Sequence, residues 1–364
     1  MTEKACVTLD GRLVDVYPGD TLLDVAQRQG VDIPALCHDP RLEPAGACRL
    51  CLVEVEGQRR MVPSCATPAT PGMVVRSKSE KVNKHRQTLL GLYLTDHPSD
   101  RTQCERHSPC ELHALADVYH APTHWQHVEP LRTGRDTDDN RFLTFSADKC
   151  ILCAKCTRYC EEIEAASAIT LAYRGPETTI ATVDHHQLRD TDCELCGGCV
   201  DICPTGAMAA VLPTRMDAPP RSQLEKVRTT CNYCGVGCQL DLHVDKKANH
   251  GRGKVVQITA PPPGSTTNDG NLCVKGRFAY QFIDHPERLT TPLVRRTDGL
   301  LHPATWEEAL TTAAKRLMEV RDKHGADALG FVSSSRCTVE ENYLVQKLSR
   351  AVFFTNNVHQ CAAT

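Results

Sequence analysis

The sequence has few aromatic residues and no long hydrophobic run. Phe, Trp and Tyr make up only 5% of its 364 residues, which suits modules in which metal clusters replace part of the core. No apolar stretch is long enough to cross a bilayer, so no membrane insertion is expected. The N-terminal segment has neither an apolar signal core nor a twin arginine, and the predicted location is therefore the cytoplasm.

Long runs of Lys or Arg are also missing. With a net charge of −3, the chain is not expected to bind nucleic acid or an anionic membrane surface. Its length suggests roughly two or three domains. We expect more than that, because metal sites allow small modules to fold around little apolar core.

Cysteine, in contrast, is abundant, with 21 residues. In a chain without an export signal, these thiols are expected to bind metal or to stay free, because disulfides are rare in the cytoplasm. The densest stretch lies between Cys150 and Cys203, where two runs share the spacing C-x2-C-x2-C-x3-C. In the two-cluster bacterial arrangement, the fourth cysteine of each run binds the other cluster.

This spacing predicts two [4Fe–4S] clusters and an electron-transfer role. The expected ligands of one are Cys150, Cys153, Cys156 and Cys203, and those of the other are Cys193, Cys196, Cys199 and Cys160. Zinc sites and disulfides are the alternatives for eight cysteines. Zinc needs only four ligands per site and has no use for this twin spacing.

Residues 1–80 predict a β-grasp ferredoxin domain. A hairpin over residues 7–16 turns at Asp10-Gly11, and a helix with a capping box begins at Thr21 and ends at Gly30. Four thiolates on a glycine-bearing loop then suit a [2Fe–2S] centre. Its expected ligands are Cys37, Cys48, Cys51 and Cys65. His38 is expected to be a structural neighbour and not a Rieske-type ligand.

A further cysteine motif follows a proline-rich segment at 212–223, where we expect a domain boundary. It reads C-x2-C-x3-C and is completed by a cysteine after a gap of 34 residues, which suits another [4Fe–4S] cluster, with a zinc ribbon as the alternative. The expected ligands are Cys231, Cys234, Cys238 and Cys273. The surrounding CNYCGVGC and NLCVKGR resemble the opening domain of molybdenum or tungsten bis-pyranopterin oxidoreductases. This resemblance implies that Lys275 lies between the cluster and a pterin and mediates electron transfer.

The front cysteines resemble the [2Fe–2S] domain of the large subunit of complex I, of [FeFe]-hydrogenases and of soluble formate dehydrogenases. In that group, H-x3-C-x2-C-x5-C binds a further [4Fe–4S] cluster. His97, Cys104 and Cys110 match this motif, but Arg101 stands at the first cysteine, and a guanidinium has no free lone pair. Three alternatives stay open: a lost cluster, a three-iron cluster, or a substitute histidine. The candidate substitutes are His107 and His113.

The C-terminal part predicts helix, strand, loop and helix, the start of a doubly wound α/β domain. Capping boxes are expected at Thr305 and Thr338, with a buried strand at 328–332 between the helices. The apolar helix faces expected to be buried are Leu310, Ala313, Ala314, Leu317 and Val320, then Leu344, Leu348 and Val352. The loop SSSRCTVEENY is similar to a pterin-contacting loop of formate dehydrogenases, which implies Arg336 and Cys337 as cofactor-binding residues.

An Asn-Asn-Val segment in formate dehydrogenases leads to the cysteine or selenocysteine that coordinates the metal. The same segment here implies that this residue follows Thr364, that Cys361 precedes it, and that the fragment contains no catalytic residue. One hypothesis is that a UGA selenocysteine codon was taken for a stop. The sequence leaves open whether the metal is molybdenum or tungsten.

The expected fold is multidomain α+β. The predicted modules are a [2Fe–2S] domain at 1–80, a small His/Cys [4Fe–4S] domain at 81–135, a double [4Fe–4S] ferredoxin domain at 136–212, a bis-pterin oxidoreductase [4Fe–4S] domain at 224–285 and an incomplete α/β molybdopterin-binding domain at 286–364. A polar linker is expected at about 121–141.

The resemblance implies the electron-transfer portion of a formate dehydrogenase. Formate would be oxidised to CO2 at a molybdenum or tungsten bis-molybdopterin guanine dinucleotide in the full-length enzyme. The implied partners are a flavin-containing, NAD-reducing subunit or hydrogenase subunits. A non-catalytic relay subunit of a complex I or hydrogenase assembly is one alternative, and another bis-pterin enzyme, such as a nitrate reductase, is a second.

Overall fold

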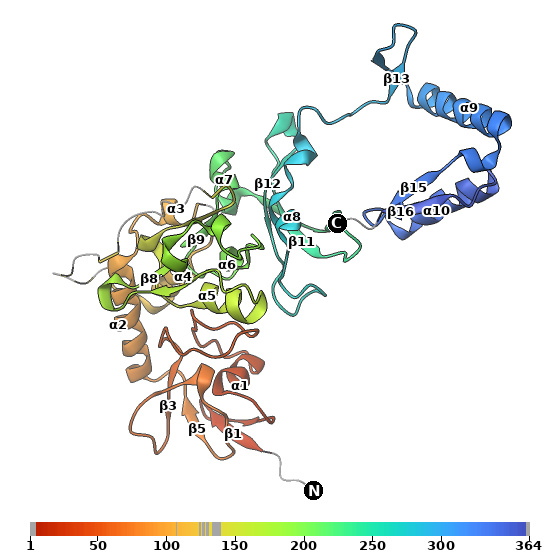
Figure 1. The fold of residues 1–364 in the computed structure, drawn as a ribbon. Helices are drawn as coiled ribbons and strands as arrows, with labels where there is room; N and C mark the ends of the chain where they lie inside the picture. The colour runs from red at the N-terminus through yellow and green to blue at the C-terminus, as the bar shows by residue number, and fades with distance from the viewer. Residues whose placement is uncertain are drawn as a thin grey trace.

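The computed structural model describes residues 5–361 apart from 107, 124, 126–127, 129–130 and 133–139. Four modules follow one another from the N-terminal β-grasp sheet to the region around β11 and β12, and an extended segment then leads to a separate C-terminal unit (Figure 1). None of the helices in these described ranges is both long and apolar enough to cross a membrane.

The first module is a five-stranded sheet with one helix across it. Its elements are β1 (Cys6–Leu9), β2 (Arg12–Asp15), α1 (Leu22–Arg28), β3 (Leu52–Val55), β4 (Val62–Pro63) and β5 (Val74–Arg76), in the sheet order β2-β1-β5-β3-β4. Asp10 and Gly11 both have positive φ, as a tight hairpin turn requires, and the capping box of Thr21 and Asp24 is present. The predicted hairpin and helix are therefore confirmed.

The second module is helical and packs on the first. It contains α2 (Glu80–Asp96), α3 (Arg101–Cys104) and α4 (Glu111–Tyr119). Arg86 of α2 is only 1% exposed, and its guanidinium donates to the carbonyl oxygens of Leu50 and Ser77 at 3.1 and 3.0 Å. Because these carbonyls belong to the β-grasp module, the buried arginine joins α2 to it. Part of the predicted linker at 121–141 lies outside the described residues.

The third module has two antiparallel pairs of short strands and very short helices. Its elements are β6 (Leu143–Phe145), α5 (Lys155–Arg158), the π-helical turn η3 (Tyr159–Ile163), β7 (Thr170–Ala172), β8 (Thr179–Ala181), α6 (Gly198–Asp201), β9 (Met208–Ala210) and α7 (Leu212–Arg215). β6 pairs with β9 and β7 pairs with β8, both antiparallel. With so little regular structure, the module depends on its core and on its cysteine loops.

The fourth module is the antiparallel sheet β10-β11-β12 followed by α8. The bounds are β10 (Glu225–Thr230), β11 (Gln239–Asp245), β12 (Lys254–Thr259) and α8 (Val274–Phe278). Leu240 and Ile258 of this sheet belong to the same hydrophobic cluster as Leu143 and Met208 of the third module. The segment at 212–223, expected to be a linker, takes part, since Leu212 and Ala218 are buried. The two modules therefore share one core.

The C-terminal unit contains a hairpin and a parallel strand pair crossed by a helix. Its elements are β13 (Leu293–Arg295), β14 (Leu301–Pro303), α9 (Trp306–His324), β15 (Phe331–Ser334), α10 (Val339–Ala351) and β16 (Val358–Cys361). β15 and β16 run parallel with α10 between them, which is the βαβ unit from which a doubly wound sheet begins. The capping box at Thr338 is confirmed.

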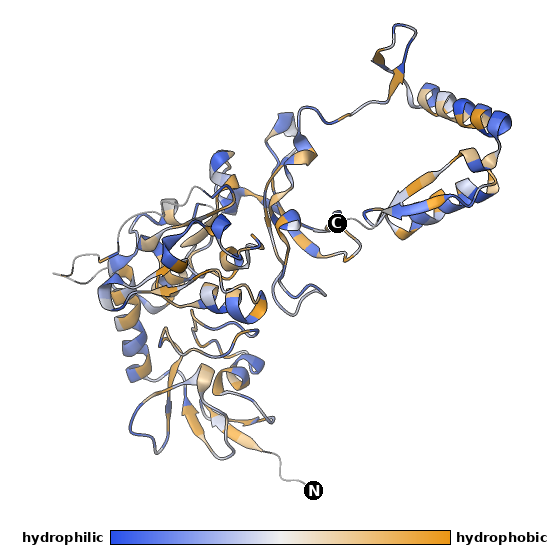
Figure 2. Cartoon of the chain, in the orientation of Figure 1, coloured by the Kyte–Doolittle hydropathy of each residue, from blue (hydrophilic) through white to orange (hydrophobic). Residues whose placement is uncertain are grey.

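Three expectations for this unit were wrong. Thr305 caps α9, but the Glu308 carboxylate pairs with Arg296 and does not return to the cap. Val332 of the strand is 72% exposed. The apolar helix faces form but are uncovered: α9, which the structure describes throughout, has no buried residue, and Leu344 is 59% exposed. Figure 2 shows hydrophobic positions alternating with hydrophilic ones along both helices.

A glycine contact in the third module gives a stability prediction. A Cβ on Gly198 would fall inside the ring of Tyr159, which is 1% exposed and cannot move aside. We expect Gly198→Ala to destabilise the protein by about 1–3 kcal/mol through overpacking. In Gly235→Ala, the added Cβ would lie 3.7 Å from its nearest neighbour, so little change is expected. Thermal unfolding of both variants checks this, and equal melting temperatures would contradict it.

His243 of β11 predicts a pH dependence. It is 3% exposed, its Nε2 lies 2.9 Å from the Thr259 hydroxyl, and burial lowers its pKa to about 4. The neighbouring charges that act on it are Arg221 and Lys226, which lower the pKa, and Asp241 and Asp201, which raise it.

Because the folded protein binds this proton more weakly than the unfolded chain, stability falls as pH drops from about 6.5 toward 4. The His243 contribution to the free energy of unfolding should fall by about 1 kcal/mol between pH 7.0 and 5.5. His243→Gln, which does not titrate, should lose correspondingly less than the wild type. Urea unfolding at the two pH values measures this difference, and identical losses would contradict the assignment.

Candidate metal centres

The cysteines predicted for the [2Fe–2S] centre lie in two contacting pairs. All four are buried, with exposures of 1% or less. The amide of Cys48 lies 3.4 Å from the Cys37 sulfur, and the sulfurs of Cys51 and Cys65 are 3.4 Å apart. The hydrogen bonds within the pairs lower the pKa of Cys37 to about 5 and that of Cys51 to about 6. Cys37 and Cys51 therefore readily form thiolates, whereas the same hydrogen bonds raise the pKa of Cys48 and Cys65, whose protons iron would have to replace.

His38 lies beside this loop without joining a ligand group. Both of its ring nitrogens are buried and have no hydrogen-bond partner among the described residues. Burial lowers its pKa, which favours the neutral ring. The structural role expected for it stays a prediction.

The eight cysteines of the third module line two separate cavities. One cavity is lined by Cys150, Cys153, Cys156 and Cys203, and the other by Cys160, Cys193, Cys196 and Cys199. Each cavity thus takes three cysteines from one run and the fourth from the other, the arrangement expected for two cubanes. The two runs also turn alike, since Leu152 and Ala154 have positive φ, as do Leu195 and Gly197 at the matching positions.

Burial makes five of these thiols, Cys150, Cys153, Cys156, Cys196 and Cys199, poor thiolates without a cation. It raises the pKa of Cys150 to about 11 and that of Cys196 to about 12. Backbone amides already point at the sulfurs: Leu152 N lies 3.4 Å from Cys150, and Gly198 N lies 3.4 Å from Cys196. This donor set fits iron–sulfur clusters, whose iron replaces the thiol protons and whose potential such amides adjust.

Three cysteines of the fourth module lie in the loop between β10 and β11, and the fourth lies at the start of α8. The amide of Cys231 donates to the carbonyl of Cys238 at 2.8 Å, and Cys273 is the N-cap of α8. The charges of Cys234 and Cys273 help to raise the pKa of both Cys231 and Cys238, so the four sulfurs are neighbours. Burial raises the pKa of Cys231, and the half-buried Lys275 opposes this shift from close by.

The predicted pterin-contacting residues lie on the loop after β15. Arg336 and Cys337 are both exposed. The Arg336 guanidinium stands 5.3 Å from the ring centroid of Tyr233, in the cysteine loop of the fourth module. The structure therefore brings Arg336 to the edge of the Cys231 site, whereas the backbone of Cys337 donates to Ser334 and accepts from the Asn342 side chain.

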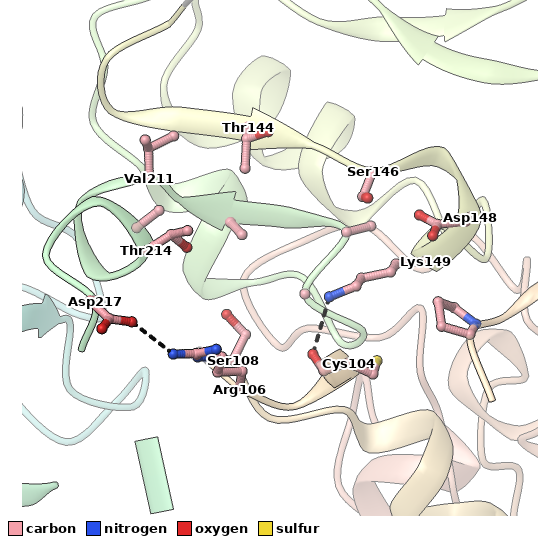
Figure 3. A pocket seen from close by; sticks show the side chains of 15 residues that line it. Cys104, Arg106, Ser108, Thr144, Ser146, Asp148, Lys149, Val211, Thr214 and Asp217 are labelled. Atoms are coloured by element: carbon pink, nitrogen blue, oxygen red, sulfur yellow. Dashed lines mark hydrogen bonds and ion pairs between the residues drawn. The ribbon is translucent and has the colours of Figure 1, made fainter. Parts of the chain in front are cut away.

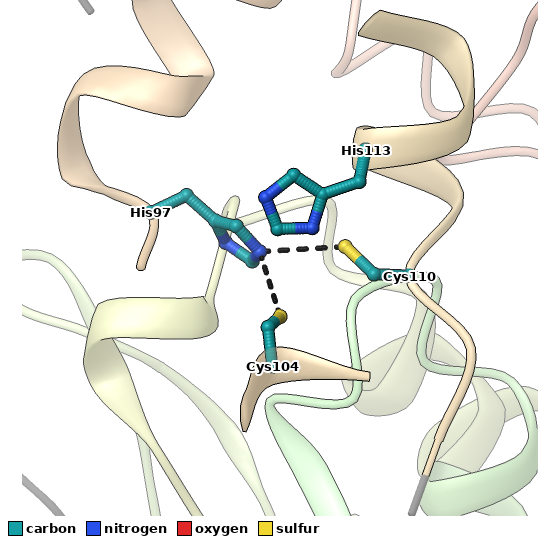
Figure 4. Close-up of side chains that lie close together, drawn as sticks. All are labelled: His97, Cys104, Cys110 and His113. Carbon is teal, nitrogen blue, oxygen red and sulfur yellow. Dashed lines mark hydrogen bonds between the residues drawn. The ribbon is translucent and has the colours of Figure 1, made fainter. Parts of the chain in front are cut away.

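The second module gathers His97, Cys104, Cys110 and His113, all buried (Figure 4). Their ligand atoms lie within 4.8 Å of one another. His107, the other candidate substitute, lies outside the described residues. His113, named from the sequence as a candidate substitute ligand, lies three residues after Cys110 on one face of α4 and joins the group.

A hollow of about 440 Å³ lies beside this group (Figure 3). Lys149 crosses it to donate to the carbonyl of Cys104 at 3.2 Å, and Arg106 pairs with Asp217 at 3.1 Å. Both contacts tie the second module to later parts of the chain. The hollow is thus a gap between packed modules.

Arginines that the sequence motifs did not single out join neighbouring sites. Arg277, 2% exposed, donates to the carbonyl of Cys196 and pairs with Asp201, both at 2.6 Å. Burial disfavours its charge, but Asp201 outweighs this and raises the pKa of Arg277. Arg158 donates to the carbonyl of Cys37 at 2.6 Å. Each arginine lies within or beside a cysteine motif, and that proximity is the signal by which it could have been found.

Four family models match the chain in order. They are a 2Fe-2S iron-sulfur cluster binding domain at residues 3–80, an NADH-quinone oxidoreductase subunit 3 ferredoxin-like domain at 141–209, a molybdopterin oxidoreductase Fe4S4 domain at 224–285 and a molybdopterin oxidoreductase domain at 288–364. The expected fold class is confirmed by these matches.

Similar proteins include the NADPH-Fe(3+) oxidoreductase subunit alpha of Geobacter sulfurreducens, 36% identical over 97% of this chain and 40% of the relative. An NADH-quinone oxidoreductase subunit of Rhizobium meliloti is 35% identical over 97% of the chain and 39% of the relative. A Staphylococcus aureus protein named "Putative formate dehydrogenase" is 30% identical over 100% and 39%. The chain thus spans about two fifths of the length of these curated relatives.

A solved structure, the NAD+-reducing [NiFe]-hydrogenase in the H2-reduced state, aligns with a TM-score of 0.51 and 33% identity over 58% of this chain and 88% of that chain. Fold, cysteine sets and relatives together define an iron–sulfur electron-transfer protein of the oxidoreductase class. Residues 224–364 match the N-terminal region of molybdopterin oxidoreductases, and iron–sulfur domains similar to those of NADH-quinone oxidoreductases stand in front of them.

The buried arginine gives a prediction for the contact between the third and fourth modules. Arg277→Met leaves Asp201 and the Cys196 carbonyl without their partner, and we expect a loss of about 3–5 kcal/mol in the free energy of unfolding. Arg76→Met removes an exposed arginine whose partner, Glu56, is also exposed, and should have a much smaller effect. Chemical denaturation measures the free energy of unfolding of both variants. Equal losses would contradict the prediction that the buried pair contributes more than the exposed one.

Proposed function

We propose that the chain is the electron-relay portion of a formate dehydrogenase. Formate would be oxidised at a molybdenum or tungsten bis-pterin held by the full-length protein, and this chain would carry the electrons away. The support is the S. aureus relative's name, the match to molybdopterin oxidoreductase domains, and the placement of Arg336 and Lys275 beside the Cys231 site.

The proposed clusters are one [2Fe–2S] and three [4Fe–4S]. Cys37 and Cys48 would bind one iron of the [2Fe–2S] centre, and Cys51 and Cys65 the other. The three cubanes would use the two cavity sets of the third module and the four cysteines around Lys275. The clusters, when bound, supply one-electron acceptance and donation. The protein would hold them near one another, with most of the thiolates buried or half-buried and Cys273 exposed.

The observation that carries this proposal is the continuity of the sites. Cys196 lines the same hollow as Cys238 and Cys273, so the fourth module's site adjoins the third module's. The two sets in the third module share their cysteine runs. Cys153 packs in one hydrophobic cluster with Cys37 and Cys48, which brings the third module to the [2Fe–2S] site.

We propose that electrons run from the Cys231 site through the Cys193 and Cys150 sites to the Cys37 site. A flavin-containing, NAD-reducing subunit or a hydrogenase subunit would accept them there. The likeness to an NAD+-reducing [NiFe]-hydrogenase chain supports a partner of this kind. It also supports the second candidate, a relay subunit of an NADH-quinone oxidoreductase type assembly that does not itself oxidise a substrate.

The full-length protein, purified without oxygen, tests the proposal. Formate should reduce a viologen dye and bleach the cluster absorbance. Lys275→Met should slow this reduction by about tenfold, equivalent to roughly 1.4 kcal/mol of barrier, with unchanged iron content. Lys247→Met, an exposed lysine of the same module, is the matched control. If formate has no effect while a nicotinamide donor bleaches the clusters, the relay candidate replaces the formate proposal.

A further inference from the structure

The four side chains of the second module come from three short elements that meet in one place. His97 is the C-cap of α2, Cys104 ends α3, and Cys110 is the N-cap of α4. His113 lies in the first turn of α4, one helical turn from Cys110 and therefore on the same face. The exposures are 6%, 2%, 3% and 9% for His97, Cys104, Cys110 and His113.

Each of the two buried imidazoles has a ring nitrogen that lacks a hydrogen bond. The Nδ1 atoms of His97 and His113 have no hydrogen-bond partner in the part of the chain that the structure describes. The nearest carboxylate, that of Glu105, is 3.8 Å from His113 Nδ1, beyond hydrogen-bond distance. The two rings meet edge to face with centroids 4.9 Å apart. A bound cation would explain why two such polar rings are buried together.

The distances suit a single metal ion. His97 Nε2 lies 3.2 Å from the Cys104 sulfur and 3.3 Å from the Cys110 sulfur. Around a tetrahedral zinc, bonds of about 2.3 Å to sulfur and 2.0–2.1 Å to nitrogen place such ligand atoms about 3.6 Å apart. No other group of three or more His, Cys, Asp or Glu ligand atoms in the described residues is gathered this closely, the other cysteine sets included.

The same distances disfavour the two iron–sulfur alternatives. In a cubane, each protein ligand binds a different iron, so the body of the cluster stands between the ligand atoms. In a Rieske centre, the two histidines share one iron and the two cysteines the other. Here one histidine nitrogen contacts both sulfurs, which leaves no room for a cluster between them.

Arg101, which stands where the family motif has a cysteine, turns away from the group. Its guanidinium is bound by Glu105, at 3.0 Å, and by Asp117, and its side chain is 46% exposed. The position is thus part of a surface ion-pair network. It leaves only one histidine and two cysteines of the motif, and His113 completes a set of four.

We propose that His97, Cys104, Cys110 and His113 bind one tetrahedral zinc ion, which holds the second module together and lies outside the electron relay. Two thiols lose their protons on binding, and two thiolates with two neutral imidazoles leave the Zn²⁺ site without net charge, as its burial favours. Zinc has no redox chemistry, so the second module does not carry electrons. Cys153 lies in the same hydrophobic cluster as Cys37 and Cys48, which provides a route that does not need the metal of the second module.

Metal analysis of the 364-residue chain, purified without oxygen, tests this proposal independently of the substrate. Mass spectrometry should find one zinc per chain, and zinc-edge X-ray absorption should show two sulfur and two nitrogen ligands. In His113→Ala and Cys110→Ser, zinc should fall at least tenfold while iron stays unchanged. The matched control is His120→Asn, at the left-handed C-cap of α4, where asparagine is tolerated.

Restoring the family motif provides the reciprocal test. Arg101→Cys combined with His113→Ala should lose zinc and gain about four irons, because one histidine and three cysteines are then available for a cubane. The unchanged iron of the other sites reports that each variant is folded. The proposal is overturned if the wild-type chain lacks zinc, if zinc is indifferent to His113→Ala, or if Cys110→Ser removes iron.

Discussion

The structure depends on one electrostatic constraint: a buried thiol loses its proton only where a cation or a hydrogen bond stabilises the thiolate. Burial raises the pKa of most cysteines in the third and fourth modules, so these thiols stay protonated unless a cation stabilises the thiolate. In the described part of the third module, the strands have three residues and the helical segments no more than five. Such modules cannot bury enough apolar surface to be stable alone, and bound metal would supply the missing free energy.

Buried arginines bind backbone oxygens across the contacts between modules. Arg86 binds carbonyl oxygens of the β-grasp module, Arg158 the Cys37 carbonyl, and Arg277 the Cys196 carbonyl together with Asp201. A planar guanidinium carries five donors and stays charged, so it can join several backbone oxygens across an interface that has little apolar area. The arginines thereby hold the candidate clusters at fixed positions relative to one another.

The second module shows how one substitution changes the chemistry of a site. A four-ligand cubane motif that loses one cysteine retains a histidine and two cysteines, which are also good zinc ligands. A helical position three residues away then supplies the fourth donor. A relay site can thereby become a structural one while the fold around it stays similar, provided that the neighbouring clusters remain in contact.

Much of the architecture was readable from local patterns. The hairpin at Asp10-Gly11, the capping boxes at Thr21 and Thr338, and the twin cysteine runs are determined by residues close together in the chain, so spacing alone was sufficient. The covering of α9 and α10 was predicted wrongly, because an apolar face shows that a helix can be buried but not what lies against it.

The sequence by itself determined which residues can bind metal and how they group within each motif, because ligand type and spacing are local properties. Only the tertiary structure decided which sites adjoin. It also decided which side chain lies where the cysteine missing at position 101 would have supplied a ligand. Those outcomes depend on packing between segments far apart in the chain, such as those that bring Cys153 and Cys37 into one hydrophobic cluster, and on the direction in which α4 presents His113.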